Sequence, residues 1–380
     1  MEWPIPPGRP YNGAAVRTEP IRVRHQLGSY PVYVEPGILG RLAELAQQHL
    51  PDRRIALIAD ATVYQLFEKG SFGPPVWSGP TLQVPPGEAS KSRESWAGLS
   101  DELLDKGFGR DSGLIALGGG MVGDLTGFVA ATYMRGVPYA LAPTTLLAMV
   151  DASVGGKTGV NTPRGKNLIG AFHPPVAVIA DPQTLATLPD REYRGGLAEA
   201  VKHGLIADQS YFEWIDSAAE AILRRDGAAL AHLVRRSVEI KAEVVSEDER
   251  ESGRRAILNA GHTVAHALES ASDYRLSHGE AVALGLVAEC AVAERMGVAH
   301  SGLSDRVRAL LQRLGLPVRA PDSLDYSAVL RRMSVDKKNR RTEIHCALAS
   351  NLGRMHSAGG WTVPIALGDL EMAMKTVVGS

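Results

Sequence analysis

Residues 114–124 read Leu-Ile-Ala-Leu-Gly-Gly-Gly-Met-Val-Gly-Asp, an apolar run that enters a cluster of four glycines. The apolar run predicts a buried strand, and the residues after it predict an amphipathic helix. Glycines at such a turn let backbone N–H groups approach a pyrophosphate, and the start of the helix favours its negative charge. The pattern is not GxGxxG, so a simple tight turn is the alternative to a nucleotide-binding loop.

Strand and helix patterns alternate on both sides of this turn. Strand patterns cover residues 21–23, 30–34 and 55–60, and residues 37–50 carry apolar side chains at helical spacing. The alternation continues to about Asp190 and predicts an α/β domain with a mostly parallel sheet. Asp60, at the end of a strand, is placed either to accept ribose hydroxyls or to cap a helix.

The pattern changes near residues 195–196. From there to about Leu314 it is helical almost throughout, with long amphipathic stretches at 230–245 and 280–296. Residues 316–380 mix short helices with brief strands. We therefore expect a flexible, proline-bearing extension over residues 1–20, an α/β domain over 21–195 and a mainly α-helical domain over 196–380.

The composition is that of an ordinary globular enzyme. The chain has 380 residues, with 41 basic and 42 acidic side chains, so no charge excess favours nucleic acid. Cys290 and Cys346 cannot build a disulfide framework, which predicts reduced thiols in a cytoplasmic protein. The sequence shows neither a signal peptide nor an apolar run of the ~20 residues that a membrane helix needs, so no membrane partner is expected.

Residues 135–167 hold cations and glycines among small polar residues. The cations include Arg135, Lys157 and Lys166. A segment of this kind buries little apolar surface, so a role in the core is not expected. The cations can instead surround the phosphate or carboxylate groups of an anionic substrate. The alternative is a solvated loop with scattered charges.

A metal site is predicted in the helical part of the chain. Glu199 and Lys202 are three residues apart at a predicted helix start and share one face. His262 and His266 are four apart and share another helical face, and His278 follows soon after. A carboxylate with two imidazoles is a common open site for catalytic zinc. The spacing alone does not say which histidines are ligands.

Taken together, these segments resemble the 3-dehydroquinate synthase family. The similarity extends over roughly residues 21–350. The matching stretches are 118–124, 131–136, 143–148, 151–161, 165–170, 196–199, 202–204, 259–263 and 278–283. The resemblance implies an NAD-binding α/β domain, a helical C-terminal domain and an active site in the cleft between them.

The resemblance also implies roles for individual residues. The implied metal ligands, for zinc or cobalt, are Glu199, His262 and His278, with His266 facing the substrate. The residues implied to hold the substrate are Asp151, Lys157, Asn167, Lys202, Lys241, Arg255 and Asn259, with Arg135 and Lys166 at an anionic end and Lys337, beside Lys338, closing over it. The residues implied to contact NAD are Asp60, Glu88, Lys91, Gly119, Gly120, Asp124, Thr144, Thr145, Thr187 and Glu192, with Lys157 and Lys166 also close to it.

The implied substrate is a sugar-acid phosphate, 3-deoxy-D-arabino-heptulosonate 7-phosphate, and the implied product is 3-dehydroquinate, in the shikimate pathway of aromatic amino acid biosynthesis. NAD would be reduced and reoxidised in each turnover, with loss of phosphate between the two steps. We expect a homodimer. The alternatives are a related cyclase for an amino analogue or for sedoheptulose 7-phosphate, a polyol dehydrogenase using NAD and a metal, and a non-catalytic binding protein. The many cations argue against a dehydrogenase, whose polyol substrates are neutral.

Overall fold

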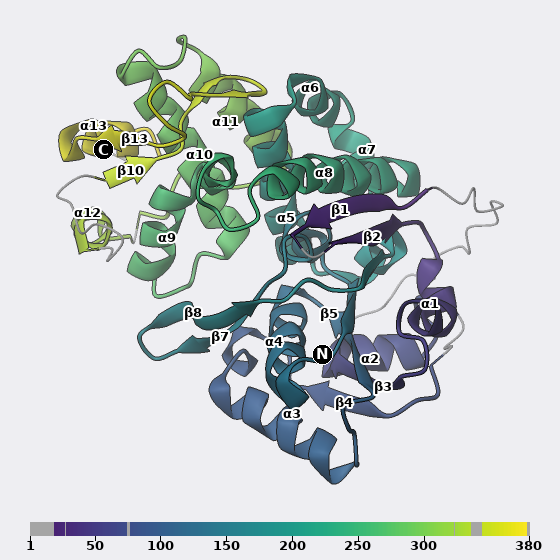
Figure 1. Ribbon diagram of the computed structural model, residues 1–380. Helices are drawn as coiled ribbons and strands as arrows, with labels where there is room; N and C mark the ends of the chain where they lie inside the picture. The colour runs from purple at the N-terminus through teal and green to yellow at the C-terminus, as the bar shows by residue number, and fades with distance from the viewer. Residues whose placement is uncertain (1–18, 27, 74–76, 323, 336–343, 378–380) are drawn as a thin grey trace.

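The structure, a computed structural model, describes residues 19–377 except residues 27, 74–76, 323 and 336–343. An α/β part and a mainly helical part lie side by side (Figure 1). The first 18 residues of the predicted extension, and the predicted lid residues Lys337 and Lys338, lie outside the described residues. None of the described helices is both long enough and apolar enough to cross a membrane.

The α/β part is built on a seven-stranded sheet with the order β1-β2-β9-β6-β5-β3-β4. All neighbours pair in parallel except β1 and β2, which confirms the predicted mostly parallel sheet. Every residue of β5 is buried, as expected for a central strand covered on both faces. The strands are β1 (Ile21–His25), β2 (Gly28–Val34), β3 (Arg54–Asp60), β4 (Thr81–Val84), β5 (Ser112–Gly118), β6 (Tyr139–Pro143) and β9 (Ala177–Ala180).

Helices and one hairpin complete this part. The helices are η1 (Ile38–Arg41), α1 (Leu42–His49), α2 (Ala61–Glu68), η2 (Glu88–Ser90), α3 (Arg93–Asp105), α4 (Gly120–Thr132), η3 (Tyr133–Arg135), η4 (Ala148–Ala152) and η5 (Pro182–Thr187), and the hairpin is β7 (Lys157–Thr162) with β8 (Gly165–Phe172). The prediction that α4 is amphipathic was wrong. This helix is buried over most of its length because it lies between the sheet and β7.

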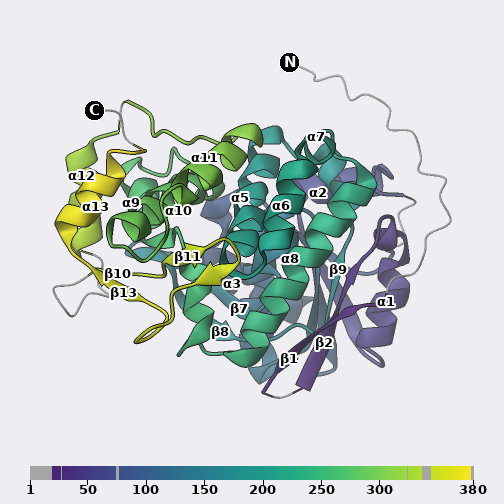
Figure 2. The same ribbon diagram turned by 90° about the horizontal axis from the view of Figure 1, so that it is seen from above.

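The remaining part is mainly helical, as predicted. Its long helix α8 lies alongside β1, so the two parts are in contact there (Figures 1 and 2). The helices are α5 (Asp190–Ala207), α6 (Gln209–Ser217), α7 (Ala219–Leu223), α8 (Gly227–Glu247), η6 (Arg254–Asn259), α9 (His262–Ala271), α10 (His278–Arg295), α11 (Leu303–Arg313), α12 (Tyr326–Val335) and α13 (Leu367–Met374). Two short strand pairs accompany them, β10 (Ile344–Cys346) with β13 (Val363–Ile365) and β11 (Ala349–Asn351) with β12 (Arg354–Met355). Cys290 and Cys346 are free and buried, in agreement with the predicted thiols.

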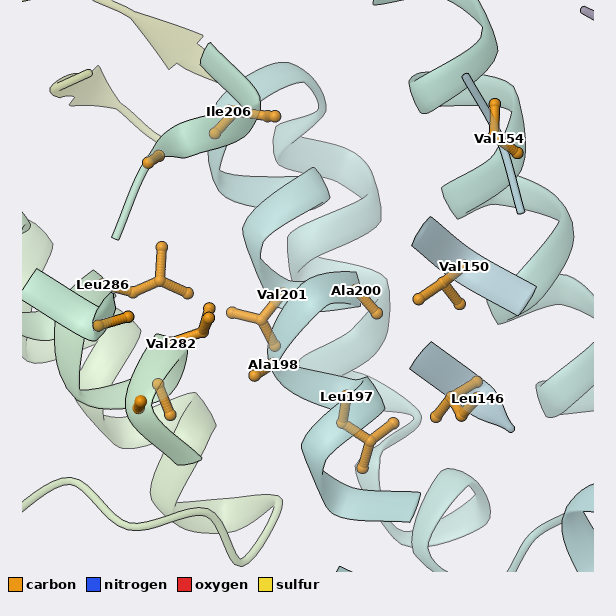
Figure 3. Close-up of a cluster of buried hydrophobic side chains, with 14 of the residues drawn as sticks. Leu146, Val150, Val154, Leu197, Ala198, Ala200, Val201, Ile206, Val282 and Leu286 are labelled. Carbon is orange, nitrogen blue, oxygen red and sulfur yellow. The ribbon is translucent and has the colours of Figure 1, made fainter. Parts of the chain in front are cut away.

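Helix α5 runs without a break through residues 195–196, where we predicted the domain boundary. One side of the helix presents Leu197 and Ala200 to Val150 and its neighbours in the α/β part (Figure 3). The other side presents Val201 to Val282 of α10 (Figure 3). The two parts therefore share apolar packing through this helix.

Helices α9 and α10 approach each other very closely. A Cβ on Gly285 of α10 would lie 1.9 Å from the carbonyl oxygen of Gly261, the residue before α9. Gly261 has no side chain to cap the helix, and the buried carboxylate of Glu289 takes that role. It accepts hydrogen bonds from Gly261 N at 2.7 Å and Val264 N at 3.2 Å. Burial raises the pKa of Glu289 from its ordinary 4.5 to about 8.

This raised pKa predicts a pH effect on stability. A carboxyl group whose pKa is higher in the folded chain stabilises the fold below its unfolded pKa, and that contribution is lost as the pH rises through the folded pKa. The free energy of unfolding of the native chain should therefore fall, relative to Glu289→Gln, between about pH 5 and pH 8, by up to about 1.4 kcal/mol per pKa unit. Urea unfolding at pH 5, 7 and 9 measures the difference. Glu294→Gln, a partly exposed carboxylate on the same helix, serves as control, and parallel pH profiles for the native chain and Glu289→Gln would contradict the prediction.

Candidate active site

The structure brings three of the predicted residues together where α5, α9 and α10 meet. Glu199 lies on α5, while His262 and His278 are the first residues of α9 and α10. Their ligand atoms all lie within 4.8 Å of one another. Glu199 Oε1 is 3.5 Å from His262 Nε2 and 3.3 Å from His278 Nε2. His266, one turn further along α9, is exposed, and it does not belong to this group of described residues.

The donor atoms of these three residues fit a divalent metal ion. Glu199 is fully buried, and neither of its carboxylate oxygens makes a hydrogen bond of regular geometry with a described residue. Burial alone raises the pKa of Glu199, but the ion pair with Lys202 outweighs it and holds that pKa well below its usual range. Burial and the nearby Lys202 lower the pKa of His262 to about 3, so its imidazole is neutral, as a metal ligand must be. One carboxylate and two imidazoles form an open site of the kind that catalytic zinc occupies. Burial lowers the pKa of His278, but the carboxylates of Glu199 and Glu269 outweigh burial and raise that pKa to about 10, so this imidazole gives up a proton when an ion binds.

The position of Glu199 within its helix differs from the prediction. We expected Glu199 and Lys202 at a helix start, but α5 begins at Asp190 and both residues lie well inside it. The interior position explains why both side chains are buried. Their spacing of three residues does place them on one face, where they form the ion pair.

Asp151 is the centre of a second group of charges. Lys241 Nζ lies 2.8 Å from its Oδ1, Lys202 Nζ lies 3.8 Å away and His203 Nε2 lies 3.6 Å away. Burial raises the pKa of Asp151, but Lys241 and Lys202 outweigh burial and hold the pKa well below its ordinary value. Burial lowers the pKa of Lys241. Lys202 therefore links this group to the predicted metal ligand Glu199, and His203 is a fully buried member that we did not predict.

A third group joins Lys157, Arg255 and Asn259 through the loop after α8. Glu251 forms an ion pair with Lys157 and accepts a hydrogen bond from Asn259 Nδ2 at 2.5 Å. Arg255 is buried, its Nη1 donates to the carbonyl oxygen of Glu249 in this loop, and its Nη2 lies 3.4 Å from the carbonyl oxygen of Gly155. Glu251 was not predicted, because it stands in the charged run 247–251, which is typical of a solvated loop. Its contacts with two predicted residues are what indicate a role.

The predicted nucleotide loop is at the carboxyl end of β5. Gly119 and Gly120 begin α4, and Asp124 follows one turn later. Thr144 N donates to the carbonyl oxygen of Gly118 at 2.9 Å, and a Cβ on Gly119 would lie 3.0 Å from Thr145 Cγ2. A small pocket lies beside this loop and reaches Lys157. Its lining residues are Ala116, Gly118, Gly119, Gly120, Gly123, Asp124, Tyr139, Leu141, Pro143, Ala152, Ser153, Gly156 and Lys157.

Asp60 caps α2 in the structure. Its Oδ1 accepts hydrogen bonds from Thr62 N at 2.8 Å and Val63 N at 3.1 Å. The cap was one of the two alternatives that the sequence allowed. Asp60 also lies next to the glycine loop, since a Cβ on Gly118 would be 3.2 Å from its Cβ. A contact with ribose stays a prediction.

Lys91 connects the nucleotide loop to the β7–β8 hairpin. Its Nζ lies 2.5 Å from Asp124 Oδ2 and 2.5 Å from Asn167 Oδ1. Asn161 Nδ2 donates to Glu88 Oε1 at 2.7 Å, and Asn161 Oδ1 accepts from Asn167 N at 3.0 Å. The structure therefore places Asn167, which we predicted at the substrate, beside residues predicted for NAD. Asn161 belongs to the same network and was missed.

Arg135, Thr187 and Glu192 are not brought to these groups, and Lys166 reaches the first group only through Glu269. Arg135 is exposed at the far end of α4, which at ~1.5 Å per residue is roughly 20 Å from the glycine loop. Thr187 donates to Thr184 O at 3.1 Å within η5, and Glu192 is exposed in the first turn of α5. Lys166 is drawn towards α9, where its Nζ lies 3.2 Å from Glu269 Oε1. The predicted roles of these residues stay predictions.

Comparisons with known proteins agree with the resemblance. The family model described as 3-dehydroquinate synthase N-terminal matches residues 81–195, and the C-terminal model matches residues 196–339. The 3-dehydroquinate synthase of Nitrosospira multiformis is 49% identical over 329 residues, which cover 86% of this chain and 89% of the relative. That of Halorhodospira halophila is 48% identical over 328 residues, which cover 86% and 91%. A solved 2-epi-5-epi-valiolone synthase from Streptomyces hygroscopicus subsp. jinggangensis, with NAD⁺ and Zn²⁺ bound, is 28% identical with a TM-score of 0.81 over 93% of this chain and 98% of the other.

Proposed function

The chain belongs to the 3-dehydroquinate synthase family, and we propose that it converts 3-deoxy-D-arabino-heptulosonate 7-phosphate to 3-dehydroquinate and phosphate, with NAD and a divalent metal ion as cofactors. The reaction is a carbon–oxygen lysis within aromatic amino acid biosynthesis. The proposal includes zinc or cobalt as the ion, a cytoplasmic location and a homodimer.

One observation carries the proposal. The ligand atoms of Glu199, His262 and His278 lie within 4.8 Å of one another, and Lys202 joins Glu199 to the charged group around Asp151. An open metal site beside buried cations suits a substrate that carries both a hydroxyl group to be activated and anionic groups to be bound. A site for a neutral polyol has no need of these cations.

In this proposal, the cofactors supply reversible hydride transfer and polarisation of a substrate oxygen, and the chain supplies the binding and orientation. Glu199, His262 and His278 hold the metal, and Gly119 and Gly120 offer backbone N–H groups to the pyrophosphate.

The side chains of the cleft then orient the substrate. Lys157 and Arg255 bind its anionic groups as charge-assisted partners. Asp151, held ionised by Lys241 and Lys202, is available as a hydrogen-bond acceptor for a hydroxyl group. Because every step acts on one bound substrate, fixed partners of this kind serve the whole reaction.

Two enzyme classes are the main alternatives. A polyol dehydrogenase releases NADH in proportion to the product, whereas the proposed reaction regenerates NAD in every turnover. A related cyclase for sedoheptulose 7-phosphate acts on a substrate without a carboxylate. The buried Arg255, together with Lys241, favours a substrate that carries one, because a buried carboxylate needs charged partners.

The test is an assay of the purified chain with the heptulosonate phosphate, NAD and zinc. We expect phosphate to accumulate over many turnovers without a matching amount of NADH. The control is sedoheptulose 7-phosphate under the same conditions, which should react far more slowly. NADH produced in step with a polyol substrate, or equal turnover of both phosphates, would show that the proposal is wrong.

A further inference from the structure

Glu269 is a buried carboxylate beside the predicted metal ligands, and nothing in the sequence pattern singled it out. It lies on α9, two turns after His262, and is 5% exposed. Its two oxygens face different partners. Oε2 lies 3.5 Å from His278 Nδ1, and Oε1 lies 3.2 Å from Lys166 Nζ.

The contact with His278 places a carboxylate acceptor beside the outer nitrogen of that imidazole. Its Nε2 faces Glu199 Oε1 at 3.3 Å, while its Nδ1 faces Glu269. When a metal ion replaces the proton at Nε2, the imidazole keeps one proton, and the acceptor at Nδ1 holds it there. The lone pair of Nε2 is then free for a metal ion, and a second partner of this kind strengthens metal binding.

His262 has the same arrangement with a different acceptor. Its Nε2 faces Glu199 Oε1 at 3.5 Å, and its Nδ1 lies 3.1 Å from the carbonyl oxygen of Ala260. Both histidines therefore direct Nε2 towards Glu199 and have an oxygen acceptor on the outer nitrogen. For His262 the backbone provides this acceptor, and for His278 the side chain of Glu269 provides it.

The contact with Lys166 joins the metal ligands to the other part of the chain. Lys166 lies on β8, and its Nζ also lies 4.3 Å from the centre of the Tyr274 ring. The next residue, Asn167, is bound to Lys91 at the nucleotide loop. Because the carboxylate of Glu269 is buried, it needs a positively charged partner, and Lys166 is one such partner. Glu269 thus stands between a metal ligand on α10 and the hairpin that reaches the nucleotide loop.

We propose that Glu269 is a positioning residue that orients His278 for the metal ion and, through Lys166, fixes the β7–β8 hairpin beside it. The inference rests on the proposed function, because that function supplies the metal ion at Glu199, His262 and His278. Glu269 itself touches neither the ion nor the substrate in this role.

The test measures zinc affinity by chelator competition, on the full chain and without substrate or NAD. Glu269→Ala should bind zinc about 10- to 100-fold more weakly than the native chain, as is typical when the outer partner of a ligand histidine is removed. Glu269→Gln keeps an acceptor oxygen for His278 and should recover most of that loss. Lys166→Met should leave zinc affinity within about threefold of the native chain, because Glu269 is still present beside Nδ1 of the ligand His278.

Hydrogen exchange of the backbone amides of residues 165–172 reports the second contact. We expect faster exchange in Glu269→Gln and in Lys166→Met, because both lose the ion pair. Zinc affinity unchanged in Glu269→Ala, or reduced as much in Lys166→Met as in Glu269→Ala, would overturn the proposal. If Glu269→Ala does not fold, unchanged exchange of the hairpin in Glu269→Gln would overturn it. These measurements need no turnover, so a failed phosphate assay of the native chain counts against the proposed function and not against this role.

Discussion

Replacing His278 with alanine should remove the metal ion and abolish phosphate release. The variant keeps only Glu199 and His262 of the three ligand residues, and two ligands do not hold a catalytic ion in an open site. After chelation and addition of zinc or cobalt, the native chain should regain its activity, while His278→Ala stays at least about a thousandfold less active, the scale of several kcal/mol of lost charge stabilisation. Metal content by mass spectrometry and phosphate release are the two measurements.

His266 provides the comparison that tests the ligand assignment. Its ring lies 5.5 Å from that of His262, but it is exposed and outside the group of ligand atoms. His266→Ala should therefore retain the ion. The control is His300→Ala, which replaces an exposed histidine in the loop between α10 and α11 and should resemble the native chain. A metal ion lost from His266→Ala but retained by His278→Ala would show that the assignment is wrong.

Replacing Arg255 with alanine should lower kcat/KM for the heptulosonate phosphate by roughly 10²- to 10⁴-fold. Arg255 is 2% exposed, and burial lowers its pKa. Its guanidinium has therefore lost contact with water and needs charged or polar partners in its place. Removing one partner of a buried charge pair costs about 3–5 kcal/mol. Steady-state kinetics of phosphate release separate the effect on KM from that on kcat.

Arg254→Ala is the matched control. Arg254 is the preceding residue, but it is more exposed and forms ion pairs with Glu243 and Glu247 at the surface. Surface pairs contribute about 0–1 kcal/mol, so this variant should stay close to the native kcat/KM. Equal losses in both variants would point to a general disturbance of the loop, and an unchanged kcat/KM in Arg255→Ala would remove Arg255 from the site.

The fold was predictable where a repeating pattern reports a local structure. The apolar runs at 55–60 and 114–117 are buried strands, and the glycines that follow the second run begin a helix. The amphipathic prediction for α4 failed because sequence periodicity does not show that a hairpin covers the second face of a helix. The same limit applies to Glu199, whose interior position in α5 depends on where the helix begins.

Some residues of the candidate site were also predictable from the sequence, and others were not. Spacing linked His262 with His266, yet only the first residue of α9 points its imidazole at Glu199. The resemblance, and not the spacing, singled out His278. Glu251, Glu269 and Glu289 were all missed, because a glutamate in a charged run or a helical pattern is usually solvated. Tertiary packing alone buries Glu269 and Glu289, partly buries Glu251, and gives all three their partners.

The continuity of α5 makes the chain one unit of folding despite its two-part layout. A chain divided at residues 195–196 would separate Leu197 from its packing partner Val150. The contact between Val201 and Val282 would then lie close to a new, less stable helix end. Neither fragment would keep a complete apolar core, so both should be prone to aggregation when expressed separately. Exchange of one half with that of a relative would succeed only if α5 were transplanted together with its packing partners on both sides. The helix therefore restricts how recombination can reshuffle this architecture.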